Sequence, residues 1–244
     1  MGIKFREDPD LQFLAHAKNE DLQILVDYLT KDKDGEKRFA QELLDEKRFI
    51  APKYSLSEVW DLIAAELQLF GGDAIANQVR GHGVLYKEIL CDACDHLSVK
   101  YDKTQSAYEI ESSVMEDMME KFWKDLTLQR RAEIKDTLGI SSELNGDALL
   151  KEILRMIRSE ASISYRAAGL LANSFAFALL GRGLGNLVGF GVSRYLGALA
   201  GPIGIAAAAL LTLFSFSGPA YRVTIPCVIQ IAYMRRVMAQ TDRY

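Results

Sequence analysis

The sequence has few of the residues on which most enzyme sites are built. It contains three histidines and three cysteines, and neither a serine nucleophile motif nor an acid–base pair in an apolar setting can be recognised. The glycine-rich stretch 181–191 has Val188 where the third glycine of a dinucleotide-binding loop would stand. We therefore expect a protein that is not an enzyme and that binds no cofactor.

Metal ligands are equally scarce. The one stretch with ligand-like spacing is CDACDH, residues 91–96. A structural zinc site uses four thiolate or imidazole ligands, and no second Cys-x-x-Cys pair is present to complete one. We interpret Cys91 and Cys94 as small residues on one helix face and predict no metal site. The first ten residues also lack an apolar run, so we expect no secretory signal and a reducing compartment.

Acidic residues are nearly absent from the last third of the chain. Residues 1–160 hold 22 lysines and arginines against 32 aspartates and glutamates, a net charge of −10, whereas residues 161–244 hold seven arginines and one acid, Asp242, a net charge of +6. The acidic first part argues against binding to duplex nucleic acid, which needs a basic surface. The asymmetry is typical of a water-exposed domain joined to a segment that contacts a membrane or a partner.

The last third has the composition of a membrane segment. Residues 195–221 form an uncharged run of 27, longer than the roughly 20 residues that a spanning helix needs, although Pro202 and Pro219 interrupt it. Small residues recur at every fourth position: Gly181, Gly185, Gly189, Ser193, Gly197 and Gly201. Such a row lets helices approach closely in lipid, so it predicts contact with the lipid bilayer and packing between copies in a homo-oligomer. Because an arginine facing lipid is costly, we expect Arg182 and Arg194 to line a water-filled lumen. The alternative is a soluble protein that buries a central apolar hairpin, as pore-forming toxins do before insertion.

The first 160 residues are expected to be helical throughout, because apolar residues recur at helical spacing and period-two alternation is nearly absent. Asn19 and Ser55 are predicted to cap helices, the latter in a capping box with Glu58, and Gly139 to end one. The predicted helices cover residues 20–29, 36–44, 55–70, 73–80, 84–97, 108–126, 128–138 and 147–159. We therefore predict an all-α protein with an acidic regulatory domain, 1–160, that folds alone, followed by a glycine-rich membrane and oligomerisation segment, 161–244.

A second candidate site lies between residues 71 and 86, where four glycines bracket a short predicted helix. Backbone amides left uncovered by glycine, together with an arginine, can hold a phosphate or carboxylate. We name Asn77, Arg80, His82 and Tyr86 as candidate ligand-binding residues. The alternative is a tight helix–helix corner in which Arg80 pairs with Glu66 or Glu88.

Three stretches carry a resemblance to a known family. These are EDLQILVDYLTKDKDG (20–35), IAAELQLFGGDAIANQVRGHGVLYKEILCDACDHLSVKYDK (63–103) and the glycine-rich end. Over nearly its whole length the chain resembles the bacterial YaaW family, to which a ubiquinol–cytochrome c chaperone label is sometimes attached. Its layout is also similar to that of membrane-channel effectors of anti-phage defence, which respond to a nucleotide made by a partner enzyme.

The function that we expect from these features is that of an inner-membrane effector with its N-terminal domain in the cytoplasm. It would form an oligomeric pore or ion channel, closed until a nucleotide or oligonucleotide activator arrives. The alternative is a membrane-protein assembly factor or chaperone that uses the hydrophobic end to hold its client.

Overall fold

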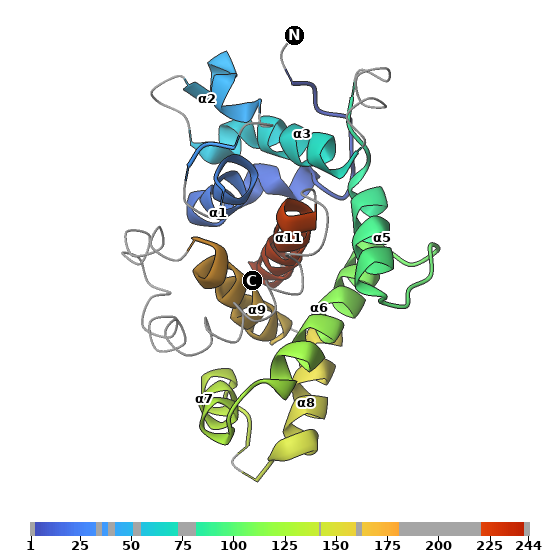
Figure 1. The fold of residues 1–244 in the computed structure, drawn as a ribbon, viewed down its shortest axis with the longest axis vertical. Coiled ribbons are helices and arrows are strands. Elements are labelled where there is room, and N and C mark those ends of the chain that lie inside the picture. Colours follow the sequence, from blue (N-terminus) through green and yellow to red (C-terminus); the bar gives the residue numbers. More distant parts are fainter. Residues whose placement is uncertain are drawn as a thin grey trace.

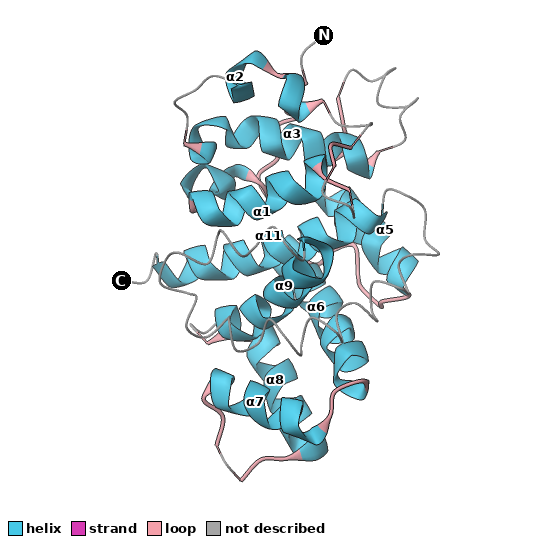
Figure 2. Ribbon diagram, turned by 60° about the vertical axis from the view of Figure 1, so that its left-hand side comes forward, coloured by secondary structure: helices cyan, strands magenta, loops and turns pink. Residues whose placement is uncertain are grey.

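The computed structural model describes residues 3–32, 36–38, 42–50, 55–72, 82–141, 143–159, 163–180 and 221–241. Within these ranges the chain forms helices and loops and no strand; a single isolated bridge joins Lys31 to Lys37. Figure 2 shows the same all-helical composition. The predicted all-α class is therefore confirmed.

Figure 1 shows the described helices in their order along the chain. They are η1 (Gln12–His16), α1 (Asn19–Thr30), η2 (Leu43–Asp45), α2 (Lys47–Ile50), η3 (Leu56–Val59), α3 (Trp60–Gly71), α5 (Tyr86–Leu97), α6 (Ala107–Lys124), α7 (Leu128–Leu138), α8 (Gly146–Arg158), α9 (Ser164–Leu180) and α11 (Tyr221–Thr241).

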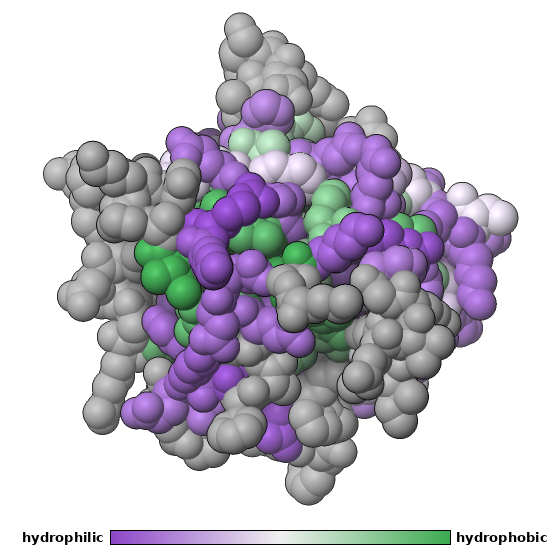
Figure 3. Space-filling view, turned by 90° about the horizontal axis from the view of Figure 1, so that it is seen from above, coloured by the Kyte–Doolittle hydropathy of each residue, from purple (hydrophilic) through white to green (hydrophobic). Residues whose placement is uncertain are grey.

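The last helix of the chain lies at the centre of the fold. Helix α11 contacts α1, α3, α5, α6 and α9, and its contact with α9 is the most extensive between any two described helices. In Figure 1 these helices surround α11, while α7 and α8 extend away from it at the lower end. The described surface at the opposite end, where α2 and α3 lie, is mainly hydrophilic with smaller hydrophobic areas between (Figure 3).

One hydrophobic core includes residues from both ends of the sequence. Buried apolar residues from Leu11 to Met234 form a single cluster, to which both α9 and α11 contribute. The core therefore does not divide at residue 160, where the sequence predicts a domain boundary. Helix α11 covers the inward faces of α1, α3, α5 and α6, and the expectation that residues 1–160 fold alone stays a prediction.

The helix ends agree with the sequence in some places and differ in others. Helix α7 spans the residues predicted for it and ends at Gly139, whose φ of 68° is left-handed as expected of a glycine C-cap. The side-chain caps predicted for Asn19 and Ser55 are wrong: Asn19 lies inside α1, whose N-cap is Lys18, and Ser55 is the N-cap of η3 but its side chain makes no capping hydrogen bond. Instead the Ser55 hydroxyl donates to the Asn19 side-chain carbonyl at 2.8 Å, so these two polar residues bind each other across the chain.

No helix within the described ranges is long and apolar enough to cross a membrane. The run 195–221, which the sequence singles out for length, lies outside those ranges except for its last residue, Tyr221. The predicted membrane segment thus remains a prediction.

Candidate functional site

Helix α11 is buried on all sides for most of its length. Its residues with less than a tenth of their surface exposed are Val223, Thr224, Ile225, Pro226, Cys227, Val228, Ile229, Gln230, Ile231, Ala232, Met234 and Arg236. A helix that is apolar around its whole circumference belongs either in the interior of a protein or in a membrane. In this structure the interior is formed by the surrounding helices.

Two arginines near the end of α11 enter the core and meet one carboxylate of α6. Glu111 is fully buried, and its two oxygens accept from Nε of Arg235 at 3.0 and 3.2 Å. Arg236, whose side chain is also fully buried, donates from Nη1 to Glu111 at 3.4 Å. The hydroxyl of Tyr86, the first residue of α5, donates to Glu111 at 3.0 Å. Glu111, Tyr86, Arg235 and Arg236 together are called the α11 charge cluster below.

Other groups accept three further hydrogen bonds from the two guanidinium groups. Arg235 donates from Nη2 to the backbone carbonyl of Asp10 at 2.8 Å. Arg236 donates to the Ala232 carbonyl at 2.9 Å and to the Ser112 hydroxyl at 2.7 Å. Among the described atoms, Nε of Arg236 has no partner.

Aromatic rings surround the same two cations. The guanidinium of Arg235 lies 4.7 Å from the ring centre of Phe13, and that of Arg236 lies 4.3 Å from that of Tyr108. Cation–π attraction is strongest where the cation is desolvated. Burial, and next the charge of Glu111, raise the pKa of Tyr86. Its hydroxyl therefore stays protonated and remains a donor to the carboxylate.

The N-terminal segment is tied to the same place through Asp8, which is 1% exposed. One of its oxygens accepts from the backbone N–H of Tyr86 at 2.7 Å, and the other accepts from that of Asp10 at 3.0 Å. Asp8 thus binds a free amide at the start of α5, a favourable position for a negative charge. Through Asp8 and Asp10, the N-terminal segment contacts both α5 and Arg235 of α11.

The structure places only part of the predicted ligand site at 71–86. Asn77 and Arg80 lie outside the described residues. Nδ1 of His82 is 2.9 Å from the carbonyl oxygen of Gly83. Tyr86 has no exposed surface, and its hydroxyl is bound to Glu111. Its side chain therefore faces the core, and the predicted ligand site stays a prediction.

The described residues of this segment, 82–86, include a close contact between Gly83 and α3. A Cβ added to Gly83 would lie 2.2 Å from the backbone carbon of Gln68, so only glycine fits there without movement. The next amide, that of Val84, donates to the Gln68 carbonyl at 3.1 Å. The Val84 amide is thus bound to α3, Leu85 is extended, and α5 begins at Tyr86, two residues later than predicted.

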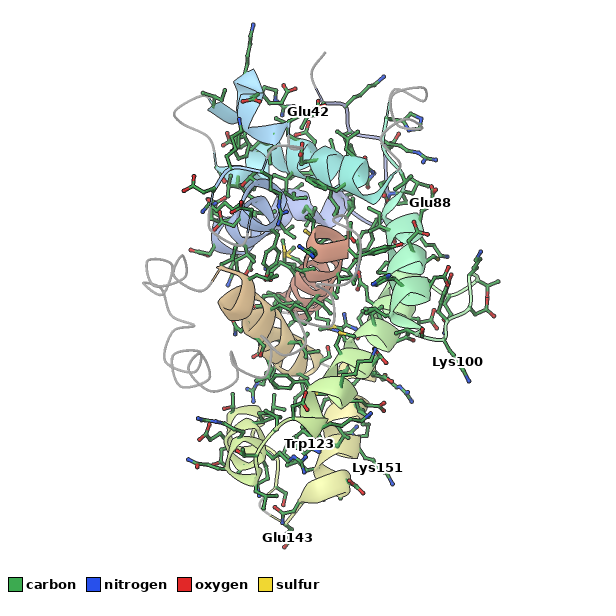
Figure 4. The ribbon with its side chains drawn as sticks, viewed as in Figure 1. Glu42, Glu88, Lys100, Trp123, Glu143 and Lys151 are labelled. Carbon is green, nitrogen blue, oxygen red and sulfur yellow. The ribbon has the colours of Figure 1, made fainter. Side chains whose placement is uncertain are left out.

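The two acids proposed as partners of Arg80 are bound to other groups. Glu88, labelled in Figure 4 on α5, pairs with Arg6 at 3.2 Å. Glu66 is buried under η2, and its oxygens accept from the backbone N–H of Glu42 at 3.1 and 3.2 Å. Burial raises the pKa of Glu66 to about 7, against the lowering effect of its bonds to the amides of Glu42 and Leu43.

The cysteines of the CDACDH stretch lie on α5. Cys94 is buried, and burial raises the pKa of its thiol to about 12, so it is not a thiolate at neutral pH. In the part of the chain that the structure describes, no three His, Cys, Asp or Glu residues are grouped as metal ligands.

The predicted pore and packing residues cannot be placed. All of them lie outside the described residues: Gly181, Arg182, Gly185, Gly189, Ser193, Arg194, Gly197 and Gly201. What the structure adds is the position of the helices on either side, α9 before this stretch and α11 after it, which pack against each other in the core.

Two features of the sequence point to the α11 charge cluster. Glu111 lies between Ile110 and Val114 on the buried face of α6, so a charge falls on an apolar helix face. Two consecutive arginines, Arg235 and Arg236, follow an uncharged run of 12 residues, 223–234. In the fold Arg235 binds Glu111 inside the core.

Comparison with known proteins gives a family but no activity. Residues 5–39 match a family described as "Domain of unknown function (DUF3944)". A UPF0174 protein of Helicobacter pylori strain J99 is 35% identical over 245 residues, which cover 98% of this chain and 96% of that protein. The UPF0174 protein YaaW of Escherichia coli K12 is 34% identical over 245 residues, covering 99% and 100%. A second UPF0174 protein of the same H. pylori strain is 36% identical over 180 residues, covering 71% of this chain and 86% of that protein.

No solved structure matches the chain. Identity at this level over almost the full length of both chains shows that the protein belongs to the UPF0174 family, which includes YaaW.

Proposed function

We propose that the protein is a membrane-acting effector. Residues 181–220 enter the bacterial inner membrane and assemble with other copies into a pore or ion channel. The described helices remain on the cytoplasmic side and keep the assembly closed until a nucleotide-derived activator binds. Arg182 and Arg194 are the charged residues of the inserted stretch, and lining the lumen they favour anions.

The proposal rests on the composition of the stretch 181–220 together with its connection to two packed helices, α9 and α11. The stretch 181–220 has two charged residues and a row of small residues at every fourth position, the pattern by which helices associate in lipid. On both sides it continues into helices, α9 and α11, that are packed together in one core. Any movement of α11 relative to its neighbours is therefore transmitted directly to the stretch that follows α9.

The test is electrical. The full-length protein is added to liposomes of phosphatidylethanolamine and phosphatidylglycerol loaded with a chloride-sensitive dye. We expect co-sedimentation with the vesicles and, in the activated state, chloride flux. The matched variant is Gly185→Leu with Gly189→Leu, which should reduce flux while leaving the helical content unchanged. Absence of both vesicle binding and flux under all conditions would refute the proposal, and stable binding without flux would favour the assembly-factor alternative.

A further inference from the structure

The centre of the core contains an unusual combination of charges. Within the α11 charge cluster, two arginines share one carboxylate, Glu111, and both Arg236 and Glu111 are fully shielded from solvent. Replacing a buried ion pair by apolar residues is often neutral or stabilising. A core whose sole requirement was stability could therefore use leucine or methionine at these positions.

The cluster also joins elements that are far apart in the sequence. Glu111 belongs to α6, Tyr86 to α5, and the carbonyl of Asp10 to the N-terminal segment. All three contact the same end of α11. Nearer the start of α11 the contacts differ: the ring of Tyr221 stacks on that of His96 at 3.9 Å, and the residues between are mostly apolar.

We propose that the α11 charge cluster is a latch that holds α11 in the closed protein and allows it to leave as a unit. The apolar residues of α11 can be covered by any apolar surface, including lipid. The buried Arg236 side chain, by contrast, needs the charge of Glu111 and the polar groups around it. The latch thus makes docking of α11 specific and makes its release sensitive to a single interaction. The consequence for activity rests on the proposed function, because release of α11 would free the stretch 181–220 attached to it.

The asymmetry of charge decides how the latch can be opened. Loss of Glu111 leaves two guanidinium groups facing each other without a counter-ion, one of them fully buried. Removing one partner from a buried pair is far more damaging than removing the whole pair. Loss of Arg236 together with Glu111 restores the original excess of one positive charge, carried by Arg235, whose side chain is 19% exposed and can reach water.

The experiment compares Glu111→Gln with the double variant Glu111→Gln/Arg236→Met in the full chain. Hydrogen exchange followed by mass spectrometry reports each helix separately. We expect Glu111→Gln to raise the exchange rate of amides in 221–241 and in 8–16 by about 100-fold or more, with little change in α7 and α8. The double variant should return most of this protection. The matched control is Glu116→Gln on the same helix, whose partner Arg158 is 72% exposed, and it should leave α11 unchanged.

Packing alone predicts a different result, since a second core substitution would add to the damage of the first. Uniform loss of protection in all helices, no change in α11, or greater exposure in the double variant would each overturn the latch. Leakage from liposomes is measured on the same samples. Selective opening of α11 accompanied by leakage supports both the latch and the proposed function. Selective opening without leakage retains the latch and rejects the pore.

Discussion

Replacing Glu66 by glutamine should remove most of a pH dependence that this buried carboxyl imposes on stability. Burial raises its pKa from an ordinary value of 4.5 to about 7, opposed by the amides of Glu42 and Leu43 and reinforced by the charges of Glu42 and Asp45. The folded state therefore binds a proton more tightly than the unfolded state. Its contribution to stability is fully present below about pH 4.5 and is lost as the pH rises through 7. A pKa difference of about 2.5 corresponds to roughly 3 kcal/mol.

The assay is urea unfolding followed by circular dichroism at pH 4.5 and pH 8.5. Glutamine carries no charge but can still accept from the Glu42 amide through its side-chain oxygen. The free energy of unfolding of Glu66→Gln, relative to the unaltered protein, should increase by about 2–3 kcal/mol between the two pH values. The control is Glu58→Gln, an exposed position on η3, for which the relative stability should change by less than about 0.5 kcal/mol. A relative stability of Glu66→Gln that is the same at both pH values would refute the reasoning.

Three further predictions concern the core, the corner at Gly83 and the glycine row. The fragment 1–160 should show no cooperative thermal transition, because it lacks six large buried residues of α11: Val223, Ile225, Val228, Ile229, Ile231 and Met234. Burial of these side chains contributes about 9 kcal/mol or more to folding, against a typical total stability of about 5–15 kcal/mol. A sharp melt of the fragment would show that the core divides after all. Gly83→Ala should lower the melting temperature by several degrees, since its Cβ would meet the backbone of α3 at 2.2 Å and overpacking costs about 1–3 kcal/mol; an unchanged melt would mean that the contact relaxes freely. Gly185→Leu with Gly189→Leu should reduce oligomer size in detergent, measured by native mass spectrometry, because two larger side chains separate helices that associate through close contact; an unchanged mass would exclude the row as an interface.

The helical character of the chain follows from local features that a sequence displays directly. Helix α7 begins and ends where its periodicity and Gly139 predict, and α3 ends at Gly71 as expected. The cap predictions at Asn19 and Ser55 failed for a reason that the sequence does not contain. Each residue is a good cap in isolation, but the fold brings the two together and their side chains bind each other.

The candidate site was less accessible to prediction. Charge segregation and the row of glycines draw attention to the last third of the chain, yet they do not show where its flanking helices go. An apolar helix is compatible with lipid and with a protein interior alike. Arg235 illustrates the ambiguity: from the sequence it can reach a membrane surface, and in the fold it binds a carboxylate 124 positions earlier.

By itself, then, the sequence determined the all-helical class, the approximate bounds of several helices and the separation of an acidic part from a nearly uncharged one, because these depend on spacing and composition along the chain. The tertiary structure alone decided that α11 forms the centre of the core, that Glu111 pairs with both Arg235 and Arg236, and that Gly83 lies against α3. Those facts depend on which helices meet, and a buried charge is informative only once the residue that neutralises it is known.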